Sequence, residues 1–285
     1  MKNSFIILSI IIFFEALQAE NLLIQSQNIK LDKKNEISIF QNEVYVQTDK
    51  NHTIKSDFAE YDKKMGVIKF KGNIELKDSK ENKISTNEAE YNEINKVFKT
   101  YGLTNISTSE NYNIETSNVV LNKKLNFVTS KKPTIITDLE NNIIKLENFE
   151  YQKEDKIFKS IGAIEITDKL NNSYQFSQLY IDTKKKEIIG TDVSAFMNDK
   201  QFKINEKNNP RVMANTFSSS KDQSIFNKSI FTLCGYRKSE DKEKCPPWTI
   251  QASKMMHDNK KKTIYYDNAL IKIYNIPIFY FPKLA

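Results

Sequence analysis

Apolar and polar residues alternate along much of the chain. From Ile68 to Leu76 every second residue is apolar or glycine, and the residues between them are lysine, asparagine and glutamate. This alternation is typical of a β-strand with one apolar face. Clusters of Asp, Asn and Lys separate such runs, for example Asp62–Lys64 and Asp78–Asn82, and these clusters indicate turns. The pattern therefore predicts antiparallel strands of about ten residues joined by tight turns.

The strands recur with a period of about 30 residues. Ala59-Glu60-Tyr61 returns as Ala89-Glu90-Tyr91 and Phe149-Glu150-Tyr151. Three apolar columns keep this phase, and they read Val46, Leu76, Ile106, Ile136, Ile166, Phe196; Ile54, Ile84, Ile114, Ile144, Tyr174, Ile204; and Ile68, Phe98, Val128, Phe158, Ile188. The repeat predicts an all-β fold, an elongated antiparallel β-solenoid or folded β-jellyroll built from two-strand units.

Three glycines, Gly72, Gly102 and Gly162, share one phase of the repeat and fall in the middle of a strand. A glycine at such a place commonly marks a bulge or a sharp bend. Bends at the same height would fold the sheet lengthwise into a trough. A close packing contact without a bend is the alternative.

The domain organisation follows from where the repeat begins and breaks. Residues 1–19 have the short positive start, apolar core and small final residue of a secretory signal peptide. The β repeats occupy 20–206, an irregular insertion with both cysteines occupies 207–247, and a final β unit occupies 248–285. Export would allow a Cys234–Cys245 disulfide; a reactive thiol, or partners elsewhere, are the alternatives.

Composition and motifs argue against catalysis. The net charge of +7 is spread along the chain, which fits a solvated surface or a mild attraction to an anionic partner such as phosphorylated lipid or nucleic acid. Nucleic acid is disfavoured because the aromatics keep to the core columns and the chain carries an export signal. His52 and His257 lie far apart, and no nucleophile, phosphate-loop or metal motif occurs. We expect no enzyme activity, no metal and no cofactor.

The repeat, of the type Ala-x-Tyr-Asp followed by Gly-x-Ile-x-Leu-x-Asp, resembles the OstA-like domain of periplasmic lipopolysaccharide-transport proteins. The segments Cys245–Ala252, His257-Asp258, Ile264–Ala269 and Ile276–Pro282 resemble the N-terminal periplasmic region of the LptD family, which leads from a β-jellyroll into an outer-membrane barrel. Since the chain stops at Ala285, without barrel strands, we expect it to be a fragment.

The resemblance implies transport and assembly of lipopolysaccharide at the periplasmic face of the outer membrane. It also implies three partners: lipopolysaccharide, an LptA-like bridge protein added at the N-terminal edge around Asn21–Ile24, and an LptE-like lipoprotein bound through the barrel. The three columns, Tyr174 and Ile188 aside, would then line a conduit for acyl chains. A soluble LptA-like bridge and a surface β-solenoid with a filled core are the alternatives.

Overall fold

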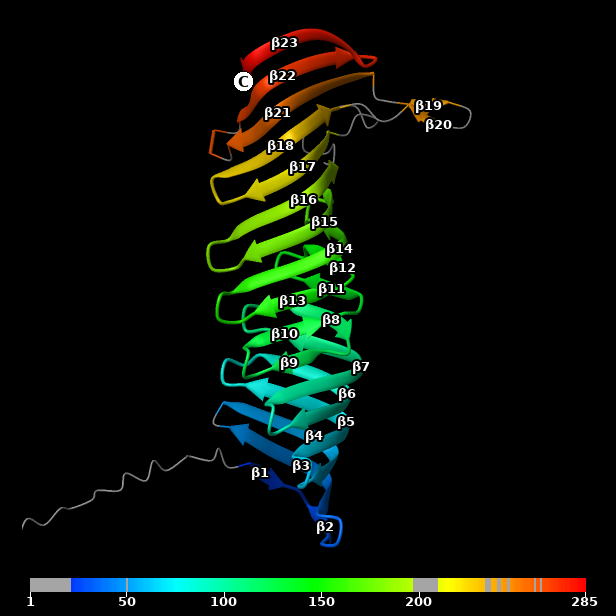
Figure 1. Ribbon diagram of the computed structural model, residues 1–285, viewed down its shortest axis with the longest axis vertical. Helices are drawn as coiled ribbons and strands as arrows, with labels where there is room; N and C mark the ends of the chain where they lie inside the picture. The colour runs from blue at the N-terminus through cyan, green and yellow to red at the C-terminus, as the bar shows by residue number, and fades with distance from the viewer. Residues whose placement is uncertain are drawn as a thin grey trace, which may run out of the picture.

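The computed structural model describes residues 22–49, 51–196, 210–233, 237–239, 242–244, 247–258, 260–261 and 263–285. All secondary structure in these ranges is β, and the strands stack into one tall ladder with a separate small hairpin at its side (Figure 1). The predicted all-β, antiparallel, elongated fold is confirmed. The signal peptide, Ile204 and the cysteine pair lie outside the described residues.

The lower part of the ladder contains β1 (Leu23–Gln25), β2 (Asn28–Asp32), β3 (Ile37–Asp49), β4 (His52–Asp62), β5 (Val67–Asp78), β6 (Lys83–Asn92), β7 (Val97–Ser107), β8 (Asn113–Ser117) and β9 (Val120–Asn122). The upper part contains β10 (Phe127–Ser130), β11 (Thr134–Thr137), β12 (Ile143–Leu146), β13 (Phe149–Gln152), β14 (Ile157–Thr167), β15 (Ser173–Asp182), β16 (Glu187–Phe196), β17 (Arg211–Ser219), β18 (Gln223–Thr232), β21 (Trp248–Asp258), β22 (Thr263–Ile273) and β23 (Ile276–Leu284). The side hairpin is β19 (Arg237–Ser239) and β20 (Lys242–Lys244).

The middle of the ladder shows that the sheet is folded into two walls. Strand β7 pairs with β8 through residues 103–107 and with β9 through residues 97–99. Strand β14 likewise pairs with β12 through 164–167 and with β13 through 157–159. We call the side with β8, β11 and β12 the first wall and the side with β9, β10 and β13 the second wall. Each long strand therefore contributes one half to each wall.

The bend between the walls lies at the glycine positions. Gly72, Gly102 and Gly162 have φ of +76°, +75° and +121°, and the strand register shifts beside each of them. Asn42, one repeat before Gly72, has φ of +63° at another register shift. The prediction that this column marks a bulge and bend is confirmed, because a residue in the left-handed region turns the strand from one wall into the other.

Gly102 offers a clean test of this backbone requirement, because a Cβ there would meet no atom within 4 Å. Gly102→Ala is expected to lower the free energy of unfolding by about 1–2 kcal/mol, the cost of placing an ordinary L-residue in the left-handed region. Gly102→Asn should cost less, since asparagine tolerates this conformation and occupies it at position 42. Urea denaturation of the two variants measures the difference; equal losses would contradict the conformational explanation.

Cross-strand pairing joins the sequence columns into continuous rows. The first row, in the first wall, reads Ile24, Val46, Ile54, Leu76, Ile84, Ile106, Ile114, Ile136, Ile144, Ile166, Tyr174, Ala195, Val212, Phe231, Ile250 and Ile271. The second row, in the second wall, reads Tyr61, Ile68, Tyr91, Phe98, Leu121, Val128, Tyr151, Phe158, Ile181 and Ile188.

Two sequence predictions are wrong. Phe196 is not in the first row; its neighbour Ala195 is, because the β15–β16 pairing lacks the extra bulge residue that β14 has beside Gly162. The expected irregular insertion over 207–247 instead contains regular strands β17 and β18, which pair with β16 and β21. The connection between β16 and β17 (197–210) is longer in sequence than the connection between β14 and β15 (168–172). The 30-residue repeat therefore changes phase before β17, and the sequence columns do not continue into that strand.

Candidate functional site

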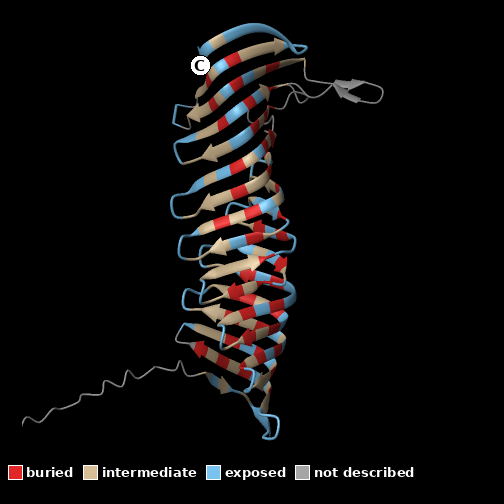
Figure 2. Ribbon diagram, viewed as in Figure 1, coloured by how far each residue is buried: buried red, intermediate tan, exposed pale blue. Residues whose placement is uncertain are grey.

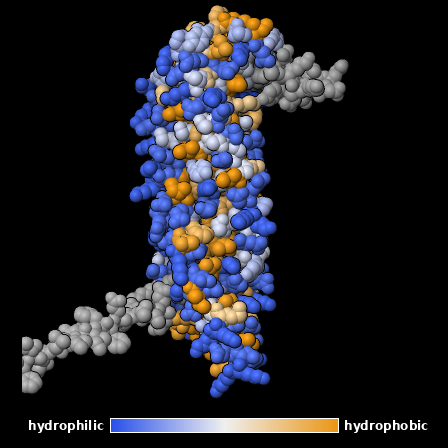
Figure 3. Space-filling view, in the orientation of Figure 1, coloured by the Kyte–Doolittle hydropathy of each residue, from blue (hydrophilic) through white to orange (hydrophobic). Residues whose placement is uncertain are grey.

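The space between the two walls is the main candidate for a site. Both rows point into it, and a single apolar core runs through it. Buried positions alternate with exposed ones along the strands, so each strand turns one face inward (Figure 2). The face of the ladder shown in Figure 3 is mostly hydrophilic, with apolar residues among the polar ones. The arrangement is a long apolar interior inside a hydrated shell.

The interior is packed more tightly in the N-terminal half (β3–β9) than in the C-terminal half (β10–β23). In the first row, Val46, Ile54, Leu76, Ile84 and Ile106 are all buried. Farther along the same row, Ile136, Ala195 and Val212 are buried, but the larger number are only half-buried: Ile144, Ile166, Tyr174, Phe231 and Ile250. The second row changes in the same direction, from buried Ile68, Tyr91 and Phe98 to mostly half-buried residues, with Phe158 the buried exception among Val128, Tyr151, Ile181 and Ile188. Water or a ligand therefore reaches the inward face more easily in the C-terminal half.

Hydroxyl groups interrupt the apolar interior near the middle of the ladder. Buried Thr100 and Thr104 are hydrogen-bonded at 2.7 Å, and buried Thr116 is hydrogen-bonded to Thr134 at 2.8 Å and donates to Ser130 at 3.0 Å. These hydroxyls satisfy one another, so burying them costs little. They lie on β7, β8, β10 and β11, close to the bend between the two walls. Sequence columns had not revealed this cluster, because its members sit beside the bend, outside the three columns.

Aromatic side chains line the C-terminal half. The ring centroid of Phe217 lies 5.9 Å from that of Phe176 and 4.9 Å from that of Phe226. The ring centroids of Phe231 and Trp248 lie 6.2 Å apart. Burial raises the pKa of Tyr174 and of Tyr266 to about 12, so both phenols stay neutral at ordinary pH. The lining here is uncharged, and it can accept apolar groups of varied shape.

Contacts between turns join the open sides of the two walls. Lys123, in the turn after β9, donates to Thr48 Oγ1 at 3.2 Å and lies over the ring of Tyr91, 5.7 Å from its centroid. Lys153, in the turn after β13, lies 4.0 Å from Asp78 Oδ2. Thr48 and Asp78 end first-wall strands, while both lysines follow second-wall strands. We call this line of contacts the seam; here it closes the interior from the side.

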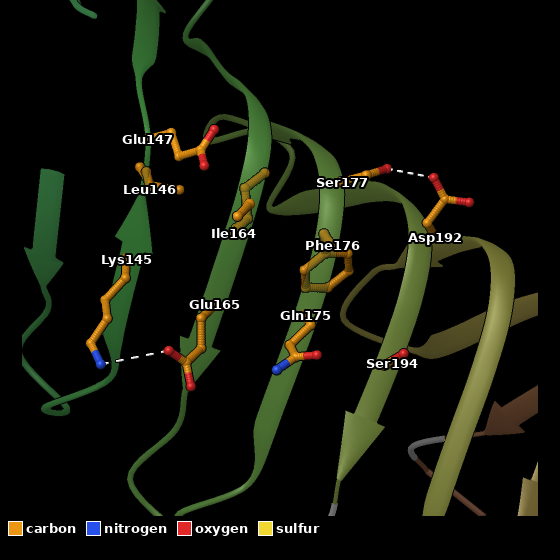
Figure 4. A pocket seen from close by; sticks show the side chains of 11 residues that line it. Lys145, Leu146, Glu147, Ile164, Glu165, Gln175, Phe176, Ser177, Asp192 and Ser194 are labelled. Carbon is orange, nitrogen blue, oxygen red and sulfur yellow. Dashed lines mark hydrogen bonds and ion pairs between the residues drawn. The ribbon is translucent and has the colours of Figure 1, made fainter. Parts of the chain in front are cut away.

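The structure also has a groove across β12, β14, β15 and β16, with a volume of about 630 Å³ (Figure 4). Its rim carries the Lys145–Glu165 ion pair and the hydrogen bond from Ser177 to Asp192. Among the described residues, no group of three or more His, Cys, Asp or Glu side chains could hold a metal ion. The mixed lining shows no arrangement of an acid, a base and a nucleophile that would indicate chemistry.

The two ends of the ladder are unlike each other. Strand β1 pairs with β3 through Leu23, Ile24 and Gln25, and β2 follows with every residue exposed. At the other end, β23 pairs with β22 and exposes Ile276, Ile278, Phe279 and Tyr280. No helix in the described part of the chain is long and apolar enough to cross a membrane.

The structure places most of the predicted lining residues together. Those buried in the interior are Val46, Ile54, Ile68, Leu76, Ile84, Phe98, Ile106, Ile136 and Phe158, and those half-buried there are Ile114, Val128, Ile144 and Ile166. Phe196 stands outside the row, as described above. Whether lipid contacts these side chains stays a prediction.

Comparison with known proteins finds a similar solved structure but no relative by sequence. No protein-family model matches the chain, and no curated protein matches it in sequence. One similar solved structure is that of LptH from Pseudomonas aeruginosa, described as the LptA-homologous periplasmic component of the conserved lipopolysaccharide transport device. The match covers 50% of this chain and 82% of LptH, at 12% identity and a TM-score of 0.23. Neither the identity nor the TM-score is high enough to assign a function to this chain.

Proposed function

We propose that the chain is an exported, periplasmic lipid conduit that takes part in lipopolysaccharide transport. The observation that carries the proposal is the pair of inward apolar rows, which run across the stacked strands and are half-exposed in the C-terminal half. Acyl chains in water gain about 25 cal/mol for each Å² of apolar surface that such a lining shields. A row of similar side chains offers no single tight site, so a lipid can move along it. The resemblance to the OstA-like repeat supports the same ligand.

The finer proposal is that the chain corresponds to the periplasmic region of the LptD family. The segment from Trp248 to Pro282 supports it, since this is where the sequence resembles that family. A soluble LptA-like bridge is the second candidate, favoured by β1, whose outer side pairs with no described strand. Lipid binding by the interior is common to both.

Lipid binding can be measured with purified protein and a fluorescent acyl probe. The probe is expected to bind the folded chain, and lipopolysaccharide is expected to displace it. If neither binds, the chain is a β-solenoid with a filled core, and the conduit proposal fails. Phospholipid vesicles serve as the comparison, because displacement by both would indicate a general acyl-chain site without preference for lipopolysaccharide.

The N-terminal edge is proposed to receive the bridge protein by strand addition. Ile24 lies in the middle of β1, and no described strand pairs with the outer side of β1. Ile24→Pro removes one backbone N–H from this short strand. Co-purification with an LptA-like protein is expected to fall while the circular dichroism spectrum stays unchanged. Unchanged co-purification would contradict docking at this edge.

A further inference from the structure

The two lips of the seam carry opposite charge. The first-wall lip consists of the turns 78–82, 108–112, 138–142 and 168–172, which together hold six acidic residues and two lysines. The second-wall lip consists of the turns 122–126, 152–156 and 182–186, which together hold seven lysines and three acidic residues. Opposite charges on two facing edges attract, and partly buried pairs are screened less by salt than exposed ones.

The contacts across the seam are specific and partly buried. Thr48 is buried at 3% exposure, and Lys123 reaches it from a turn 75 residues farther along the chain. The Asp78 side chain is 11% exposed, and its other carboxylate contacts hold it in place: Asn82 donates to both of its oxygens at 2.8 and 2.9 Å. Asp78 is therefore a fixed acceptor for Lys153, and its pKa lies below the usual value although burial opposes this shift.

On the first wall, the seam contacts lie beside the buried part of the first row. Leu76 and Ile84, beside Asp78, are buried in the first row. In the next turn of the second-wall lip, the position equivalent to Lys123 and Lys153 is occupied by Thr183. In the second row, half-burial begins beside the lysine turns, at Val128 and Tyr151, and continues at Ile181 and Ile188 on either side of the threonine turn. The threonine turn therefore lies within the part of the interior that is more open.

We propose that the seam is a lateral gate, in which Lys123 and Lys153 hold the N-terminal half of the interior shut and the C-terminal half stands open to the side. An amphiphile would enter sideways through the C-terminal half, with its acyl chains between the walls and its polar headgroup outside. It would pass into the N-terminal half only when the lysine contacts separate. The nature of this ligand rests on the proposed function; the gate itself does not.

The gate can be tested without lipid, by labelling interior cysteines with a maleimide in protein whose Cys234 and Cys245 are replaced by serine. Ile84→Cys reports on the closed half and Ile144→Cys on the open half of the same row. Ile84→Cys is expected to react on the order of tenfold more slowly than Ile144→Cys. Adding Lys123→Ala together with Lys153→Ala to Ile84→Cys should raise its labelling rate by roughly tenfold, because the contacts of the two lysines with Thr48, the Tyr91 ring and Asp78 are lost.

Two controls separate opening of the seam from loosening of the fold. Lys124→Ala changes an exposed lysine in the same turn as Lys123 and should leave the rate at Ile84→Cys unchanged. Ile74→Cys, buried beside the bend and away from the seam, should stay unreactive in the double variant. An unchanged rate at Ile84→Cys, or faster labelling at Ile74→Cys as well, would overturn the gate. Because no lipid is present, this result is independent of whether the proposed function holds.

Discussion

Phe98→Ala is expected to lower the free energy of unfolding by about 3–5 kcal/mol, which is the cost of removing a fully buried phenyl ring and leaving a cavity. The Phe98 side chain has 0% exposure and lies in the second row between Tyr91 and Leu121. Both neighbours are held by ladder hydrogen bonds and cannot close the space. Urea denaturation followed by circular dichroism measures the loss.

Phe231→Ala is the matched control, because Phe231 also points inward but is only half-buried in the C-terminal half. It is expected to cost about 1–2 kcal/mol, since less surface is removed from contact. Similar losses at the two positions would contradict the difference in packing between the two halves, and with it the distinction between a closed and an open part of the interior.

Ile166→Glu is expected to reduce binding of the acyl probe and of lipopolysaccharide by at least about tenfold, because it places a carboxylate in the half-exposed apolar lining. Ile166 lies in the first row between Ile144 and Tyr174, and its side chain is partly accessible. The charge can therefore reach water in the empty protein, so the fold should persist. Displacement titration with the fluorescent probe measures the effect.

The control for this variant is Gln175→Glu, which adds the same charge on the outward side next to Tyr174. It should leave binding unchanged within about twofold, since an exposed surface substitution has little effect. If Gln175→Glu weakens binding as much as Ile166→Glu, the effect is one of net charge. The inward face would then have no special part in binding.

The sequence predicted the repeat, the strands and the bend because each is a local property. Alternation around Ile74 sets the inward face, and the mid-strand Gly102 supplies the left-handed backbone that the bend requires. The interior positions of Ile54, Leu76 and Ile84 follow from period two together with a constant phase. These residues are all buried where the columns placed them.

What the sequence did not reveal depends on register and on distance along the chain. A one-residue difference at the bulge beside Gly162 moved Ala195 into the row where Phe196 was expected. The seam joins Lys123 to Thr48, 75 residues apart, which depends on how far one wall is offset against the other. No column in the sequence encodes that offset, although the alternation of acidic and basic turns is a signal that could have indicated it.

The conduit proposal requires the inward face of the ladder to contact the acyl chains of lipopolysaccharide. A photo-crosslinking amino acid placed at Ile136 or at its neighbour Ile135 tests this most directly, because β11 turns one inward, at 6% exposure, and the other outward, at 42%. Irradiation of cells should give lipopolysaccharide adducts from position 136, and likewise from the inward Ile106, but not from position 135 or the outward Lys99. Adducts only from positions 135 and 99, or equally from both faces, would contradict the account.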